Sequence, residues 1–130
     1  MKTLLLFTLL ASPLVCHAAA SSPIDVYRAA AQQENAGFKD FSAARGDSFY
    51  HAKSGDVACA SCHSASPKDH GKHTTTGKDI LPMAPSANPQ RFADAAKTEK
   101  WFRRNCSDVL KRACTATEKG DFITYLSSVK

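Results

Sequence analysis

Two cysteines and a histidine stand together near the middle of the chain, in the run Cys59-Ala60-Ser61-Cys62-His63. Two thiols three positions apart can form thioether bonds to both vinyl groups of one haem, and the adjacent imidazole can then bind the iron. A C-x-x-C pair alone would also suit a zinc site or a redox dithiol. The histidine directly after the second cysteine favours one covalent haem c, attached through Cys59 and Cys62 with His63 as the proximal ligand.

A second ligand to such an iron has three candidates downstream of the motif. Met83 lies in a proline-rich segment, and a thioether is the usual distal ligand of cytochromes that carry electrons. His70 and His73 follow His63 by only seven and ten residues, so the chain would have difficulty reaching the opposite face of the haem. Met83 is therefore the plain candidate of the three, and the two histidines are expected to be solvated loop residues.

The first twenty residues have the pattern of a secretory signal peptide. Lys2 is followed by an apolar run and by alanines at 18–20 that suit a cleavage site. The run is too short to span a bilayer, which requires about 20 apolar residues. We expect cleavage after residue 20, with Cys16 discarded, and a single soluble domain over residues 21–130 in the periplasm.

Composition narrows the class of protein further. The whole chain has a net charge of +5, and Lys2 is the only charged residue in the first twenty, so residues 21–130 carry +4. This charge suits an acidic protein partner and lacks the basic density of a nucleic-acid binder. Four cysteines remain after residue 20, an even number that fits two haem thioethers and one disulfide in an oxidising compartment.

The sequence predicts helices and no convincing strand. Ser22 and Pro23 are typical of an N-cap and a first helical position, so one helix should run from there toward Gly37. A second helix should start near Ser42 and carry Gly46, Phe49 and Tyr50 just ahead of the haem motif. Residues 64–91, rich in glycine and proline, are expected to form a long loop.

Helical spacing returns in the last third of the chain. Residues 92–104 predict a helix with Phe92, Ala96 and Trp101 as its inward positions. Residues 115–118 form a capping box, after which apolar side chains repeat along one helical face. These side chains are Phe122, Ile123, Leu126 and Val129.

This organisation resembles class I cytochrome c over most of residues 21–130. In that fold an N-terminal helix with the pattern Gly46, Phe49, Tyr50 crosses a C-terminal helix such as residues 120–129, beside the haem. A glycine is needed there because a close helix crossing leaves no room for a side chain. The resemblance implies an all-α class I cytochrome c fold, with four to five helices around one covalently bound haem.

A second, more specific resemblance covers residues 45–130. It is to the sphaeroides haem protein (SHP) family, high-spin monohaem cytochromes c of class I fold. The segments that carry it are TGKDI at 76–80, APSANP at 84–89, RF at 91–92, EKW at 99–101 and RNC at 104–106, with Cys114 and the Glu118-Lys119 helix start.

The SHP resemblance implies a distal ligand other than methionine. An asparagine at the position of Asn105 ligates the oxidised iron, and reduction releases it so that oxygen, nitric oxide or a similar diatomic can bind. The resemblance also implies a disulfide between Cys106 and Cys114 beside the ligand, and a dihaem cytochrome c as the electron donor. Turnover of oxygen or nitric oxide by an oxidoreductase activity stays open.

The chemistry of Asn105 agrees with this role. A carboxamide oxygen is a hard, weak donor that suits ferric iron and holds ferrous iron poorly, whereas the soft thioether of Met83 would bind ferrous iron and block the position. We therefore favour Asn105 as distal ligand and keep Met83 as the alternative, in which the protein is an ordinary His/Met electron carrier. A structural role for Asn105 would be a helix C-cap.

Basic side chains gather around the proposed ligand segment. Either an acidic electron donor docks there or these residues form an ordinary solvated helix face. A non-haem module with a zinc site is the weakest alternative, since Cys106 or Cys114 would have to leave its disulfide to supply a ligand. The basic residues are Lys97, Lys100, Arg103, Arg104, Lys111 and Arg112.

Overall fold

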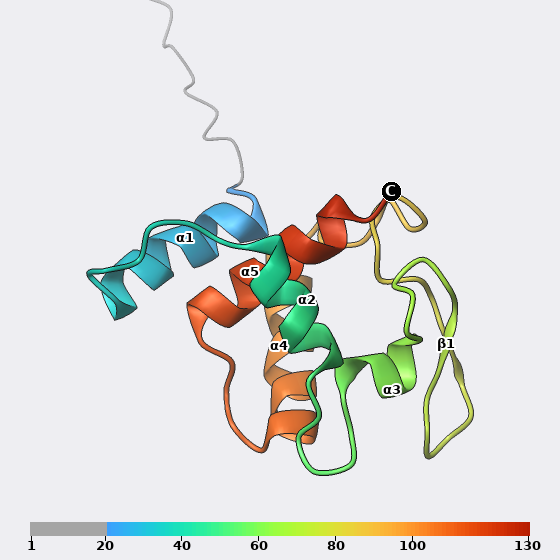
Figure 1. Cartoon of the computed structure of the whole chain (residues 1–130). Helices are drawn as coiled ribbons and strands as arrows, with labels where there is room; N and C mark the ends of the chain where they lie inside the picture. Colours follow the sequence, from blue (N-terminus) through green and yellow to red (C-terminus); the bar gives the residue numbers. More distant parts are fainter. Residues whose placement is uncertain (1–20) are drawn as a thin grey trace, which may run out of the picture.

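The computed structural model describes residues 21–130, in which five helices and one short strand pair are formed (Figure 1). The signal peptide predicted over residues 1–20 lies outside the described residues. The helices are α1 (Pro23–Glu34), α2 (Ala43–His51), α3 (Cys59–His63), α4 (Ala95–Leu110) and α5 (Ala116–Ser128). None of them is long and apolar enough to cross a membrane.

The predicted caps of the first and last helices are confirmed. The Ser22 hydroxyl accepts a hydrogen bond from the backbone N–H of Asp25, with Pro23 in the first turn of α1. At the start of α5 the Thr115 hydroxyl accepts from the backbone N–H of Glu118, whose carboxylate accepts in return from the N–H of Thr115. Each cap satisfies backbone donors that a helix end leaves free.

The crossing of α2 over α5 is the most extensive contact between helices. Gly46 lies so close to α5 that a Cβ there would be 2.1 Å from the carbonyl oxygen of Asp121. The carboxylate of Asp121 is buried and accepts hydrogen bonds from Arg45 Nε at 2.6 Å and from the backbone N–H of Ser42 at 2.6 Å. On the other side of the crossing, the ring of Phe41 fills the space above Gly120.

The core lies along this crossing and extends to α1 and α4. Its aromatic rings pack edge to face or tilted, in a continuous series. Tyr27 contacts Phe102 with ring centroids 5.7 Å apart, Phe102 contacts Phe122 at 5.5 Å, and Phe122 contacts Tyr50 at 5.9 Å. The cluster ties α1, α2, α4 and α5 together.

Helix α4 differs from its prediction in start, length and phase. It begins at Ala95, after Asp94 caps it with a hydrogen bond from the backbone N–H of Lys97. Phe92 precedes the helix in a left-handed backbone conformation with φ 64°. The buried face carries Thr98, Phe102 and Cys106, so the prediction that Ala96 and Trp101 point inward was wrong.

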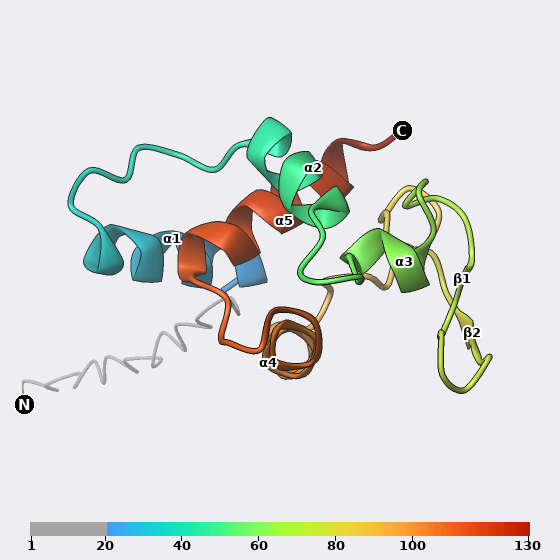
Figure 2. The same cartoon turned by 60° about the horizontal axis from the view of Figure 1, so that its bottom comes forward.

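The predicted long loop over residues 64–91 is confirmed, with one addition. Strands β1 (Gly71–Lys72) and β2 (Asp79–Ile80) pair antiparallel within it, a ladder too short for sequence periodicity to indicate. Figure 2 shows this hairpin beyond α3, on the side away from α1. The hairpin therefore lies beside the segment that carries the C-x-x-C-H motif, with Gly71 against its end.

Candidate functional site

The C-x-x-C-H motif forms the whole of α3, a single helical turn. Ala58 precedes the turn, and its backbone N–H donates to the Ser61 hydroxyl at 2.9 Å. Positions three apart lie on the same side of a helix, so the turn presents Cys59 and Cys62 together. Both cysteines are free thiols, and burial raises the pKa of the Cys59 thiol to about 11. A thiol protonated at neutral pH is unlike a reactive redox dithiol.

His63 ends the turn with an imidazole suited to bind a metal ion. Its Nδ1 atom is buried and has no hydrogen-bond partner within residues 21–130. Burial, together with the nearby positive charge of Arg91, lowers the pKa of His63 to about 4. The ring is therefore neutral at physiological pH, the form that binds iron.

The backbone around His63 is held by a tyrosine and a glycine. The hydroxyl of fully buried Tyr50 lies 2.9 Å from the His63 carbonyl oxygen and 2.7 Å from that of Ser64, to either of which it can donate. Gly71 packs against the end of α3, where a Cβ would be 2.0 Å from the Cys62 carbonyl oxygen. These contacts hold the backbone of His63 in place and so set the direction in which its imidazole points.

The hydroxyl contact of Tyr50 was missed by sequence reasoning, which assigned this residue only to the helix crossing. A tyrosine rather than a phenylalanine at a buried core position was the signal that could have found it, because a buried hydroxyl requires a partner. Arg91 was likewise noted only as part of a motif. Its hydrogen bonds to the carbonyls of Leu81 and Pro82 depend on how the loop folds.

Met83 lies in a loop segment that is hydrogen-bonded to Pro67 and Arg91. The backbone N–H groups of Met83 and Ala84 both donate to the carbonyl of Pro67, at 2.8 and 2.9 Å. The Arg91 guanidinium donates to the carbonyls of Leu81 and Pro82. The Met83 side chain is buried in the hydrophobic cluster.

The two loop histidines have local partners. His70 Nδ1 is 2.8 Å from Asp79 Oδ2, and both side chains are more than half exposed. His73 Nδ1 accepts a hydrogen bond from the backbone N–H of Thr76 at 3.2 Å. Both contacts belong to the β1–β2 hairpin and agree with a solvated loop role.

Asn105 lies inside α4, five residues before the helix ends at Leu110. The proposed C-cap role was therefore wrong, since the left-handed cap residue is Lys111. The Asn105 side chain is half-buried and makes no hydrogen bond within the part of the chain that the structure describes. The amide is not among the buried polar atoms that lack a partner, so it is accessible to water, and no hydrogen bond within residues 21–130 holds it in place.

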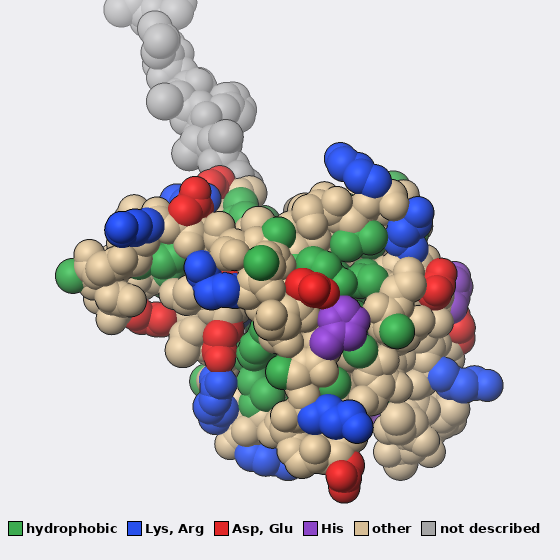
Figure 3. Space-filling view, in the orientation of Figure 1, with side chains coloured by type: hydrophobic (Ala, Val, Ile, Leu, Met, Phe, Trp, Pro, Cys, Tyr) green, Lys and Arg blue, Asp and Glu red, His purple; other side chains and the backbone are tan. Residues whose placement is uncertain are grey.

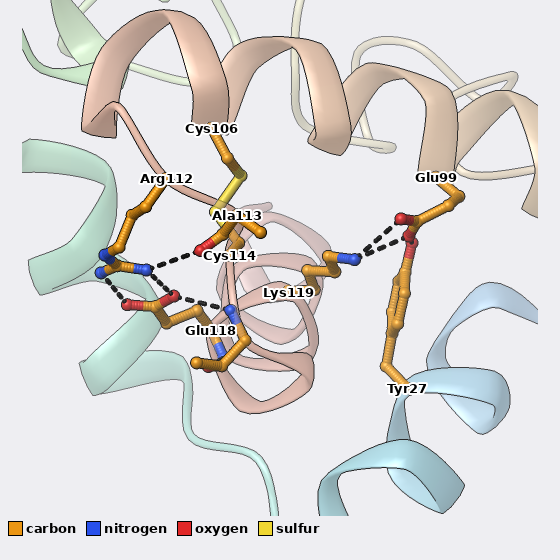
Figure 4. The surroundings of a disulfide bond; sticks show 9 residues. Tyr27, Glu99, Cys106, Arg112, Ala113, Cys114, Glu118 and Lys119 are labelled. Atoms are coloured by element: carbon orange, nitrogen blue, oxygen red, sulfur yellow. Dashed lines mark hydrogen bonds and ion pairs between the residues drawn. A yellow bond between two sulfur atoms is a disulfide. The ribbon is translucent and has the colours of Figure 1, made fainter. Parts of the chain in front are cut away.

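The disulfide joins Cys106 to Cys114, with Cα atoms 5.7 Å apart, the pairing that the SHP resemblance implied (Figure 4). It connects the buried face of α4 to the segment before α5. Its cysteine on α4, Cys106, directly follows Asn105. Both sulfur atoms are thereby occupied, so the zinc alternative lacks the extra cysteine ligand on which it depended.

Comparisons with known proteins relate the chain to one family and to two curated proteins. The family described as Domain of unknown function (DUF1924) matches residues 36–126. Cytochrome c-type protein SHP from Cereibacter sphaeroides is 48% identical over 71 residues, which are 55% of this chain and 54% of SHP. Cytochrome c'' from Methylophilus methylotrophus is 46% identical over 71 residues, covering 55% of this chain and 49% of that protein. The chain thus spans about half the length of these curated relatives.

Solved structures extend the likeness to most of the fold. Oxidised cytochrome c'' from Methylophilus methylotrophus aligns with a TM-score of 0.76 and 35% identity, over 83% of this chain and 92% of that one. Oxidised SHP, described as an oxygen-binding cytochrome c, aligns with a TM-score of 0.71 and 39% identity, over 82% of this chain and 93% of that one. The predicted all-α cytochrome c fold is confirmed. The chain therefore belongs to the DUF1924 family and, with SHP and cytochrome c'', to the c-type cytochromes, proteins in which haem c is bound covalently.

Proposed function

We propose that Cys59 and Cys62 attach one haem c and that His63 is its proximal ligand. The observation that carries the proposal is the imidazole of His63: it is neutral, its backbone is held in place, and its buried Nδ1 atom makes no hydrogen bond within residues 21–130. Two free thiols stand on the same helical turn. The haem supplies an iron that can change its oxidation state, and the residues around it decide which ligands that iron can take.

We assign the distal position to Asn105. Its amide oxygen is a weak donor that suits ferric iron, so reduction would release it and leave a position for a small diatomic such as oxygen or nitric oxide. The half-buried amide without a partner supports this assignment. Further support comes from the relatives, since SHP is described as an oxygen-binding cytochrome and a solution structure of cytochrome c'' addresses haem-ligand detachment.

The alternative with Met83 as ligand has less support. Its side chain is already buried in the core cluster, and its backbone is tied to Pro67, only four residues after His63. To bind on the face opposite His63, Met83 would have to leave both sets of contacts. Asn105 would approach the iron from α4, a separate element with its own contacts.

The disulfide supports a positioning role beside the ligand. A covalent link at Cys106 limits how far the neighbouring Asn105 can move when the iron releases it. We propose that the protein is exported to the periplasm after cleavage of residues 1–20, where the disulfide is stable. A cytochrome, by resemblance a dihaem cytochrome c, would supply electrons to it.

Mass spectrometry and absorption spectra of the mature protein test whether the haem is attached. A mass increase of one haem, together with a pyridine haemochrome spectrum of a doubly attached haem, is expected for the native chain. A mass equal to that of the bare polypeptide would refute attachment. This measurement comes first because every later one depends on it.

The distal ligand is then tested with two matched variants. Asn105→Ala should alter the ferric spectrum while Met83→Leu leaves it nearly unchanged, and native ferrous protein should be high-spin and bind carbon monoxide rapidly. A low-spin ferrous spectrum, with a far-red ferric thioether band that disappears in Met83→Leu, would establish the ordinary electron carrier instead.

A further inference from the structure

The outer face of α4 combines positive charge with one exposed aromatic ring. Lys97, Lys100 and Arg104 follow one another at helical spacing on the side opposite the buried stripe, with Trp101 beside them. Figure 2, which looks nearly along α4, shows no other element below the helix. We call these four residues the α4 basic face.

The charges of this face are available to a partner. Neither Lys97 nor Lys100 makes an ion pair within residues 21–130, and Arg104 lies 3.8 Å from Asp108, with both side chains 67% exposed. Arg112 is different, because its guanidinium binds the Glu118 carboxylate at 2.6 and 2.8 Å (Figure 4). The basic cluster noted in the sequence therefore contains two lysines, Lys97 and Lys100, that make no ion pair within residues 21–130, and two arginines, Arg104 and Arg112, that are paired with Asp108 and Glu118.

Trp101 gives the face a specific centre. Its indole is 44% exposed and takes no part in the hydrophobic cluster, and the Arg104 guanidinium lies 5.9 Å from its ring centroid. Tryptophan and arginine are the residue types that most often dominate binding energy in protein interfaces. An exposed indole among basic side chains is complementary to a partner surface that is apolar at its centre and acidic around it.

These features favour a protein over a nucleic acid. On the face that Figure 3 shows, Lys and Arg side chains are scattered with Asp and Glu among them, rather than gathered in one tract. Asp94 and Asp108 stand at either end of the α4 basic face, where a phosphate backbone would meet them. A compact acidic patch can avoid both carboxylates.

We propose that the α4 basic face is the docking surface for an acidic electron-transfer protein, with Trp101 as its anchor. The inference rests on the proposed function, because it requires a haem that accepts electrons. Trp101 and Asn105 are four positions apart, which places their Cβ atoms about 5–6 Å from each other on the helix. Docking would therefore bring the donor within one helical turn of the proposed distal ligand.

Reduced flavodoxin, an acidic flavoprotein, is the probe. Its hydroquinone gives one electron to the ferric protein and becomes the semiquinone, while the iron becomes ferrous; stopped-flow absorbance follows both changes. Reduction by native protein should slow as salt is added, and Lys97→Glu/Lys100→Glu should slow it about tenfold at low ionic strength. Trp101→Ala should slow it with less change in the salt dependence.

Binding is measured separately with oxidised flavodoxin, which transfers no electron. Calorimetry should show about a tenfold weaker Kd for Lys97→Glu/Lys100→Glu. The matched control is Lys39→Glu/Lys78→Glu, which makes the same change in net charge at exposed positions outside α4. It should retain most of the native affinity.

Reduction by a neutral hydroquinone separates the two proposals. If every variant reacts with it at the native rate but the charge reversals on α4 act no differently from the control pair, the docking surface is wrong and the proposed function stands. If Trp101→Ala changes the haem spectrum and not the reaction with flavodoxin, the indole packs on the haem, and the proposal is overturned. Two results together would also overturn it. Native protein would bind duplex DNA in a salt-sensitive way that Lys97→Glu/Lys100→Glu abolishes, and the same variant would leave flavodoxin binding unchanged.

Discussion

Replacing Gly46 with alanine should destabilise the crossing that supports the haem-binding turn. The added Cβ would lie 2.1 Å from the carbonyl oxygen and 2.6 Å from the carbonyl carbon of Asp121. These are backbone atoms, which cannot rotate away as a flexible side chain can. To reach an ordinary contact of about 3.5 Å, α2 and α5 would have to separate locally by about 1.4 Å.

The free-energy cost has two parts. Overpacking in a well-packed region costs about 1–3 kcal/mol. The same separation stretches the bonds from Arg45 to Asp121, whose side chain is only 5% exposed, and a buried carboxylate that loses its partner costs about 3 kcal/mol or more. The better helix propensity of alanine returns about 1 kcal/mol. A net loss of at least about 3 kcal/mol is therefore expected, a large part of a typical stability of about 5–15 kcal/mol.

Urea unfolding of the haem-loaded protein, followed by far-ultraviolet circular dichroism, measures this loss. Gly37→Ala is the control, because a Cβ there would approach no backbone atom of another element among the described residues; its one near neighbour there is the side-chain oxygen of Asn35, at 3.2 Å, which also accepts a hydrogen bond from the Gly37 N–H. The control should stay within about 0.5 kcal/mol of native. A loss below about 1 kcal/mol for Gly46→Ala would show that the crossing relaxes freely, and would refute the reasoning.

Two further predictions concern pH. Burial of the Glu99 carboxyl acts to raise its pKa, but hydrogen bonds from Lys119 and Tyr27 outweigh burial and lower it. The native protein should therefore be more stable than Glu99→Gln near neutral pH, and the difference in urea midpoints should shrink as pH falls below about 4. Burial of His51 acts to lower its pKa, yet the carbonyls of Ala65 and Asp47 raise it; the stability that it adds is full below about pH 6.5 and should be lost as pH rises above that value. A His51→Gln variant whose unfolding free energy runs parallel to native from pH 6 to 9 would contradict the second.

Helices with clear local signals could be predicted from sequence. The caps at Ser22 and Thr115, with apolar repeats behind them, were sufficient for α1 and α5. Helix α4 was placed too early because Phe92 has the right spacing for a helical face, whereas its left-handed backbone and the Asp94 cap exclude it from the helix. The shift of phase turned Trp101 from an expected core residue into a surface one.

The site was predictable only where its chemistry is local. Adjacent residues define the C-x-x-C-H motif, so its spacing was readable without a fold. The contacts of Tyr50 with the His63 carbonyl and of Arg91 with the segment before Met83 join distant parts of the chain. No periodicity encodes such contacts, since they depend on where the long loop settles.

The buried thiol of Cys59 has a consequence for the order of maturation. With a pKa of about 11, only about one Cys59 side chain in ten thousand is a thiolate at pH 7, so this sulfur is slow to form disulfides once the chain has folded. The same burial would also slow thioether formation at this sulfur in the folded chain. The proposed haem attachment should therefore be faster at Cys59 before α3 has packed into the fold than after it.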